Sequence, residues 1–215
     1  MTDRDGFTLT PVERSAVAAS PCDAIYPPTE KMPAIVVEHF PALGRLAAMR
    51  FIEWVREHPE GVVSLPTGKT PEHFIRCVRH LRDTWDEPDT RQELEAAGVD
   101  TSRRPRFDGL HFVQIDEFYP IEPRHEHSFY SYVRNFYIRG FGLDPERAML
   151  MNCEEIGLPP DASLRDIWPE GRVDLTLRTR APHSQEEERQ QRVLFRVDQW
   201  CQEYEDRIRA MGGIG

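Results

Sequence analysis

The run Gly68-Lys69-Thr70 matches the end of a nucleotide-binding P-loop. A complete P-loop needs a glycine five positions before Gly68, and this chain has Val63 there. Pro66 lies inside the would-be loop and removes one of the backbone N–H groups that hold phosphate. ATP binding is therefore the weaker interpretation, and a phosphate site of another kind stays open.

The same loop is suited to binding a phosphate group. It follows the apolar run 61–65, which predicts a buried parallel strand, and it leads into a helix expected to begin at Pro71 with Thr70 as its N-cap. The N–H groups at a helix N-terminus favour anions, and a glycine lets the backbone approach one closely. The candidate phosphate ligands are Thr67, Gly68, Lys69 and Thr70. A well-capped turn without a ligand is the alternative.

Two adjacent acids, Asp116 and Glu117, follow a second apolar run at 111–115. A carboxylate at the carboxyl end of a buried strand is partly removed from water, which favours its protonated form and suits a general base. In open α/β sheets, ligands bind where loops leave the carboxyl ends of the strands. We therefore predict an active-site role for this pair, the alternative being solvated surface acids or helix caps.

Residues 124–128 read Arg-His-Glu-His-Ser, and the spacing of His125 and His127 resembles that of metal ligands. Both rings would point the same way only in an extended segment, whereas Ser128 predicts the cap of the next helix. A metal site also needs a defined third ligand, which the sequence does not name. We expect surface histidines, no metal and no cofactor.

Composition excludes several classes of protein. Acidic residues outnumber basic ones and give a net charge of −10, so the average surface repels nucleic acid. No apolar run approaches the ~20 residues that a membrane helix needs, and the N-terminus is too polar for a signal peptide. The four cysteines are far apart without a C-x-x-C pair, which favours reduced thiols. We expect a soluble cytoplasmic protein that binds neither nucleic acid nor membranes.

Helical and strand patterns alternate, which predicts an α/β fold with an open, mostly parallel sheet. Residues 1–33 contain five prolines and little apolar periodicity, and they predict an extended arm before a domain at 34–215. Residues 86–109 are charged and turn-rich. Helices are expected from near 41 to 57, from 71, over 128–139 and over 187–210, and strands at 61–65, 111–115, 147–151 and 173–177.

Together these loops resemble those of the glucosamine-6-phosphate deaminase family, which includes 6-phosphogluconolactonase-like proteins. Residues 64–71, Ser-Leu-Pro-Thr-Gly-Lys-Thr-Pro, are similar to the family's Leu-Pro-Thr-Gly-Gly-Thr-Pro phosphate loop. Ile-Asp-Glu-Phe at 115–118 is similar to its Met-Asp-Glu-Tyr. The resemblance covers about residues 40–215, with weaker similarity at His125, 128–132, 134–136 and 204–208.

The resemblance implies a Rossmann-like three-layer fold and an aldose–ketose isomerisation of glucosamine 6-phosphate with release of ammonia. It implies that Thr67, Gly68, Lys69 and Thr70 hold the sugar phosphate. It also implies that Asp116 moves a proton between C2 and C1 of the opened sugar, with Glu117 beside it. Such a reaction needs one carboxylate that reaches two adjacent carbons, and phosphate anchoring brings them within its reach.

The chain departs from the family in two places. Lys69 stands where the family has its second glycine, and the chain has no Asp-Gly-His, whose histidine assists ring opening in the family. We expect the N-terminal portion of a longer enzyme or a truncated product, with a sheet incomplete at its C-terminal end and little or no activity alone. A non-catalytic phosphosugar-binding module and a lactonase-like hydrolase are alternatives, and a homo-oligomer formed through exposed strand edges stays open.

Overall fold

The computed structural model describes residues 8–21 and 34–215 and divides the chain into two compact units. The first contains the described residues up to Glu60, together with Gly68–Leu110 and Gly140–Gly142. The second contains Gly61–Thr67, His111–Arg139 and Leu143–Gly215. No helix within the described ranges is long and apolar enough to cross a membrane.

The first unit is helical. Its main helices are α1 (Pro11–Ala19), α2 (Phe40–Glu57), α3 (Glu72–Asp83) and α4 (Pro88–Ala96).

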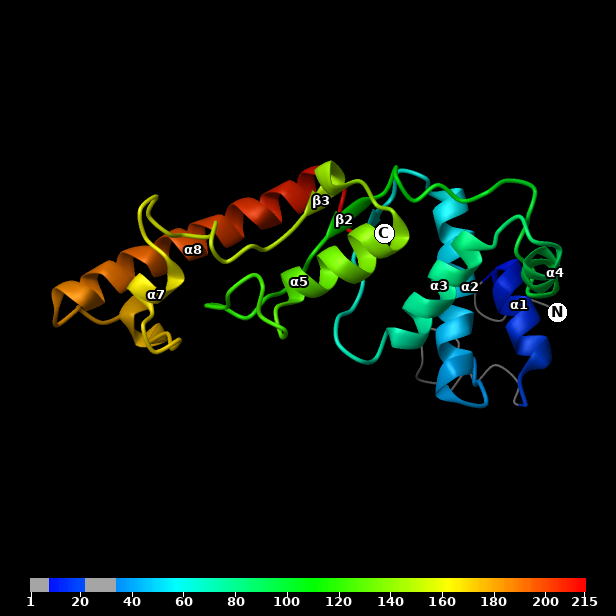
Figure 1. The fold of residues 1–215 in the computed structure, drawn as a ribbon, viewed down its shortest axis with the longest axis horizontal. Helices are drawn as coiled ribbons and strands as arrows, with labels where there is room; N and C mark the ends of the chain where they lie inside the picture. Colours follow the sequence, from blue (N-terminus) through cyan, green and yellow to red (C-terminus); the bar gives the residue numbers. More distant parts are fainter. Residues whose placement is uncertain (1–7, 22–33) are drawn as a thin grey trace. The chain divides into compact units, whose positions relative to one another are not determined.

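Helices α2 and α3 pack side by side and form the core of this unit (Figure 1). Their buried residues recur at three- and four-residue spacing, as the sequence predicted for both helices. Four phenylalanine rings from α2, α3, one loop and the short helix α6 (Arg139–Phe141) pack together with centroids 5.5–6.2 Å apart: Phe51, Phe74, Phe107 and Phe141. Burial of these rings stabilises the unit.

Helix α1 corrects the prediction of an extended arm over residues 1–33. Thr10 and Glu13 form a capping box, and Pro11 occupies the first turn, where a missing N–H costs nothing. The buried Glu53 of α2 accepts a hydrogen bond from the Val12 N–H at 3.3 Å, which ties α1 to α2. The arm's other residues, 1–7 and 22–33, lie outside the described residues.

Helix α4 lies in the stretch 86–109, where only turns were expected. Its buried residues are Thr90 and Leu94, so its apolar face is too small to give a helical pattern in the sequence. Pro88 in its first turn is the signal that marks its start.

The second unit contains a three-stranded parallel sheet in the order β1 (Val62–Val63), β2 (His111–Val113) and β3 (Ala148–Met149). Its other elements are α5 (Phe129–Val133), the π-helical turn η1 (Arg134–Ile138), η2 (Pro145–Arg147), α7 (Leu164–Ile167), η3 (Leu175–Arg178) and α8 (Gln185–Ala210). The short helix α6 (Arg139–Phe141) continues η1 and crosses from the second unit into the first. The predicted α/β class with a parallel sheet is confirmed, and the three-layer arrangement stays a prediction.

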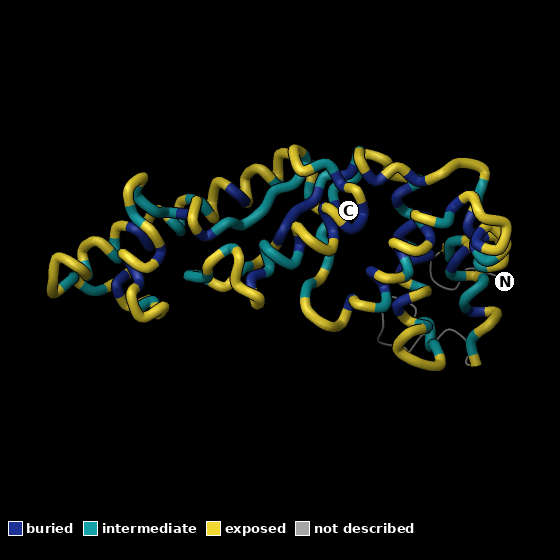
Figure 2. Tube along the Cα trace, in the orientation of Figure 1, coloured by how far each residue is buried: buried dark blue, intermediate teal, exposed yellow. Residues whose placement is uncertain are grey.

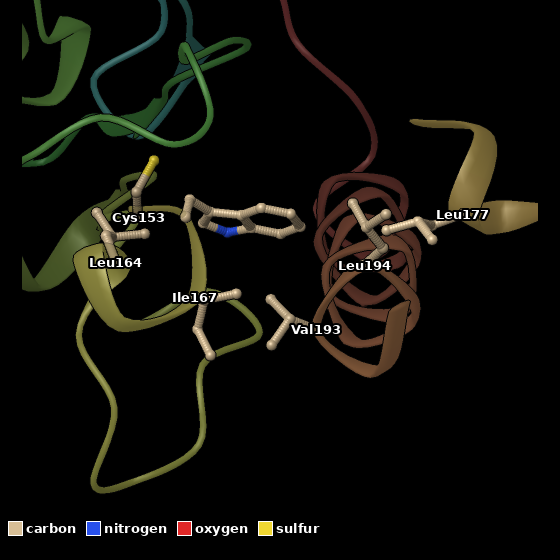
Figure 3. Close-up of a cluster of buried hydrophobic side chains, with 7 residues drawn as sticks. Cys153, Leu164, Ile167, Leu177, Val193 and Leu194 are labelled. Atoms are coloured by element: carbon tan, nitrogen blue, oxygen red, sulfur yellow. The ribbon is translucent and has the colours of Figure 1, made fainter. Parts of the chain in front are cut away.

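One end of α8 packs into a core of its own. Figure 3 shows Leu194 of α8 pointing at Leu177 of η3, and Val193 pointing at Ile167 of α7. Figure 2 shows the remaining face of α8 as mostly exposed. The sequence predicted this helix from its amphipathic pattern, and its polar outer face agrees with that pattern.

Two strand predictions need correction. Residues 173–177 form no strand, because Leu175 starts the 3₁₀ turn η3 and only Leu177 of that turn is buried. Strand β2 ends at Val113, so Ile115 lies beyond it with 61% of its surface exposed. The apolar patterns therefore predicted a strand at 173–177, where the structure has none, and a strand at 111–115 that is longer than β2.

Replacing Gly44 by alanine is expected to destabilise the protein, although alanine is the better helix former by about 1 kcal/mol. A Cβ at Gly44 of α2 would lie 2.5 Å from the Cβ of His73 and 2.8 Å from the Phe74 nitrogen of α3. Overpacking of this kind costs roughly 1–3 kcal/mol, which outweighs the gain. Urea unfolding measures the change. Ala47→Gly, on the exposed face of the same helix, is the control and should lose about 1 kcal/mol from propensity alone.

Stability should also fall in acid because of an ion-pair cluster at the start of α8. The Arg180 guanidinium and the His183 N–H hold the pKa of Glu187 at about 2, below its ordinary 4.5. A lowered pKa in the folded state gives stability that is present above pH 4.5 and lost as the pH falls towards 2. In the Glu187→Gln variant, the midpoint of urea unfolding should depend less on pH between about 4.5 and 2. An unchanged pH dependence would mean that solvent screens the cluster completely.

Candidate functional site

The loops that follow β1 and β2 leave the sheet at the same end. The two strands are parallel, with Val62 opposite His111 and Val63 opposite Phe112. Thr67 follows the end of β1 and Asp116 follows the end of β2. The carboxyl end of the sheet is where open α/β folds bind their ligands.

The sequence-predicted site residues are divided between the two units. Thr67, Asp116 and Glu117 belong to the second unit, whereas Gly68, Lys69 and Thr70 belong to the first. The structure therefore groups Thr67 with the two acids at the carboxyl end of the sheet.

A buried tyrosine fixes the loop after β1. The hydroxyl of Tyr137 donates a hydrogen bond to the carbonyl of Pro66, next to Thr67. Its ring stacks on Phe112 of β2 with centroids 5.7 Å apart. Burial raises the pKa of Tyr137 well above its ordinary value, so the hydroxyl stays a donor. The start of the candidate phosphate loop is therefore held against the sheet.

The start of α3 differs from the prediction. The helix begins at Glu72, and its N-cap is Pro71, which makes no side-chain cap hydrogen bond. Thr70 is thus not the cap, because a turn closed by the Glu72 N–H and the Lys69 carbonyl at 3.3 Å precedes the helix. Gly68 has φ +88°, a conformation that favours glycine, and Lys69 and Thr70 are exposed.

Asp116 is exposed, and among the described residues its carboxylate has no hydrogen-bond partner. The expectation that it would be partly withdrawn from water is wrong, because β2 ends three residues earlier. Its backbone carbonyl accepts a hydrogen bond from the Gln114 side chain at 2.9 Å. The side chain is free for chemistry while the peptide that carries it is held.

The roles of Gln114 and Tyr204, which form hydrogen bonds at this end of the sheet, were not predicted from the sequence. The buried Gln114 amide also accepts from the Met151 N–H at 3.0 Å. The Tyr204 hydroxyl of α8 lies 2.7 Å from the carbonyls of both Gln114 and Met149. A glutamine inside the apolar run 111–115 was the available signal, since a buried amide must find partners.

Glu117 has the opposite environment to Asp116. Its carboxylate accepts hydrogen bonds from the Ser128 hydroxyl at 2.9 Å, the Phe129 N–H at 3.0 Å and the Tyr130 N–H at 2.7 Å. These groups form the N-terminus of α5, where Ser128 is the N-cap, as predicted. Beside this contact the Phe118 ring packs on Phe129 at 4.9 Å.

His125 and His127 are both exposed, with ring centroids 5.3 Å apart. The N–H of His127 donates to the Nδ1 atom of His125 at 3.1 Å, so that nitrogen is an acceptor within the loop. Among residues 8–21 and 34–215, no three His, Cys, Asp or Glu side chains lie close enough together to hold a metal ion.

The α/β fold is similar to that of a solved enzyme structure from the NagB superfamily. The solved structure of a monomeric glucosamine-6-phosphate deaminase of that superfamily matches 83% of this chain with a TM-score of 0.52 and 16% sequence identity. The match spans 50% of the deaminase, so the chain covers about half of its length. No family model and no curated protein matches the sequence.

Tyr137→Phe tests the anchor of the loop after β1. Loss of the hydroxyl leaves a carbonyl without this donor, which should lower the free energy of unfolding by roughly 1–3 kcal/mol in a urea titration. Tyr130→Phe is the matched control, because its hydroxyl contacts only the exposed Arg134, at 3.3 Å. The control should change stability by under about 0.5 kcal/mol. Equal effects of the two variants would show that the Pro66 contact does not hold the loop.

Proposed function

We propose that this protein acts on a phosphorylated amino sugar as a glucosamine-6-phosphate deaminase, in carbohydrate metabolism. In the reaction, glucosamine 6-phosphate and water give fructose 6-phosphate and ammonia through an aldose–ketose isomerisation. One observation carries the proposal. The carboxylate of Asp116, which accepts no hydrogen bond from the described residues, follows the central strand of the sheet, and a glucosamine-6-phosphate deaminase has a similar fold.

The proposed mechanism gives Asp116 the proton transfer. A carboxylate that accepts no hydrogen bond from the described residues can take a proton from C2 of the opened sugar and return it to C1. Its held peptide, and a carboxylate without a partner among the described residues, suit a group that must reach two adjacent carbons. The reaction then depends on how the sugar is held.

Thr67, Gly68, Lys69 and Thr70 are the proposed phosphate ligands. Gly68 has a positive φ, as in a tight turn, and an added Cβ there would meet nothing within 4 Å. The Lys69 ammonium is exposed and supplies a positive charge.

Asp116→Asn tests the proposal. Removing the proton acceptor should lower ammonia release from glucosamine 6-phosphate by about 10²–10⁴-fold. Phosphosugar binding, measured by calorimetry, should stay nearly intact because the phosphate loop is unchanged. Asp161→Asn makes the same chemical change at another exposed position of the second unit and should leave turnover unaffected.

Three outcomes would contradict the deaminase proposal. Hydrolysis of 6-phosphogluconolactone without ammonia release would indicate a lactonase. Saturable phosphosugar binding without turnover, in the protein as its own cell makes it, would indicate a binding module. The exposure of Asp116 favours that second candidate, since a general base is normally shielded from water. Full activity of Asp116→Asn would remove Asp116 from the mechanism.

A further inference from the structure

Glu117 uses both of its carboxylate oxygens. One oxygen accepts from the Ser128 hydroxyl at 2.9 Å and from the Tyr130 N–H at 2.7 Å. The other accepts from the Phe129 N–H at 3.0 Å and from the Phe118 N–H at 2.9 Å. Four donors aimed at two oxygens match the two hydrogen bonds that each carboxylate oxygen can accept.

These donors link the two ends of the loop 118–127. Phe118 lies at its start, and Ser128, Phe129 and Tyr130 follow its end. The Ser128 hydroxyl donates to Glu117 and accepts from the Ser131 N–H at 3.2 Å, so its orientation is fixed. The positive end of the helix that begins here compensates the charge of the carboxylate.

Asp116 lies between this contact and a second one. On its other side, the Gln114 side chain donates to the Asp116 carbonyl at 2.9 Å and accepts from the Met151 N–H at 3.0 Å. The Asp116 peptide is therefore held from β2 on one side and from α5 on the other. The Asp116 carboxylate itself is exposed.

We propose that Glu117 is a positioning residue, which fixes the Asp116 peptide to the N-terminus of α5 and carries no proton itself. The inference rests on the proposed function and goes further, because sequence reasoning assigned both acids to catalysis. Both oxygens of Glu117 are engaged by donors, whereas the Asp116 carboxylate accepts no hydrogen bond from the described residues, and this difference separates their roles.

Glu117→Gln tests this role, because the amide places an NH₂ group against backbone donors. A misplaced Asp116 should lower kcat by about 100-fold with little change in KM, since the phosphate ligands are untouched. The pH–rate profile should keep both of its limbs at reduced height. Hydrogen exchange at the amides of residues 115–118 should become at least about 10-fold faster, because local opening sets that rate. Glu126→Gln, an exposed acid of the same loop, is the control and should change none of these.

Two results would overturn the inference. Unchanged exchange at residues 115–118 would show that Glu117 does not hold the Asp116 peptide. Loss of one limb of the pH–rate profile, with normal exchange, would make Glu117 a proton carrier. If the unmodified protein releases no ammonia, the deaminase proposal fails while the exchange result still decides the positioning role. If Glu117→Gln does not fold, Ser128→Ala removes one donor and should accelerate the same exchange, and unchanged exchange in Ser128→Ala would equally overturn the inference.

Discussion

The short parallel sheet depends on hydrogen bonds that side chains make at its carboxyl end. Its strands have two or three residues each and form few backbone bonds of their own. The Tyr204 hydroxyl closes this end by meeting the carbonyls of Gln114 and Met149, and the Gln114 amide extends the network to Met151. Because buried polar groups are costly to leave unpaired, this network determines where the loops after β2 and β3 begin.

The loop after β2 places two adjacent acids in opposite environments. Asp116 is exposed, and its carboxylate accepts no hydrogen bond from the described residues. Glu117 accepts three hydrogen bonds from the start of α5. Environments that separate two carboxylates in this way commonly separate their chemical roles. The arrangement supports one acid that reacts and one that positions it.

Carboxylates accept hydrogen bonds from backbone N–H groups near several helix starts in the described residues. Glu53 binds the start of α1, Glu117 binds the start of α5, and Glu187 accepts from the His183 N–H just before α8. Each carboxylate satisfies donors that a helix start leaves unpaired. The start of α5 already holds a fixed negative charge, which disfavours a phosphate there and supports the loop after β1 as the phosphate site.

Local sequence patterns determined α2, α3 and α8 and the approximate positions of the three strands, because long apolar periodicity and apolar runs specify these elements directly. They failed for α4 and for residues 173–177, where one or two buried side chains give too little pattern. The sequence also placed the acids after β2, but it did not show their different environments. Only the tertiary structure decided those, because three of the four donors to Glu117 lie 11–13 residues away and Tyr204 lies 90 residues from Gln114.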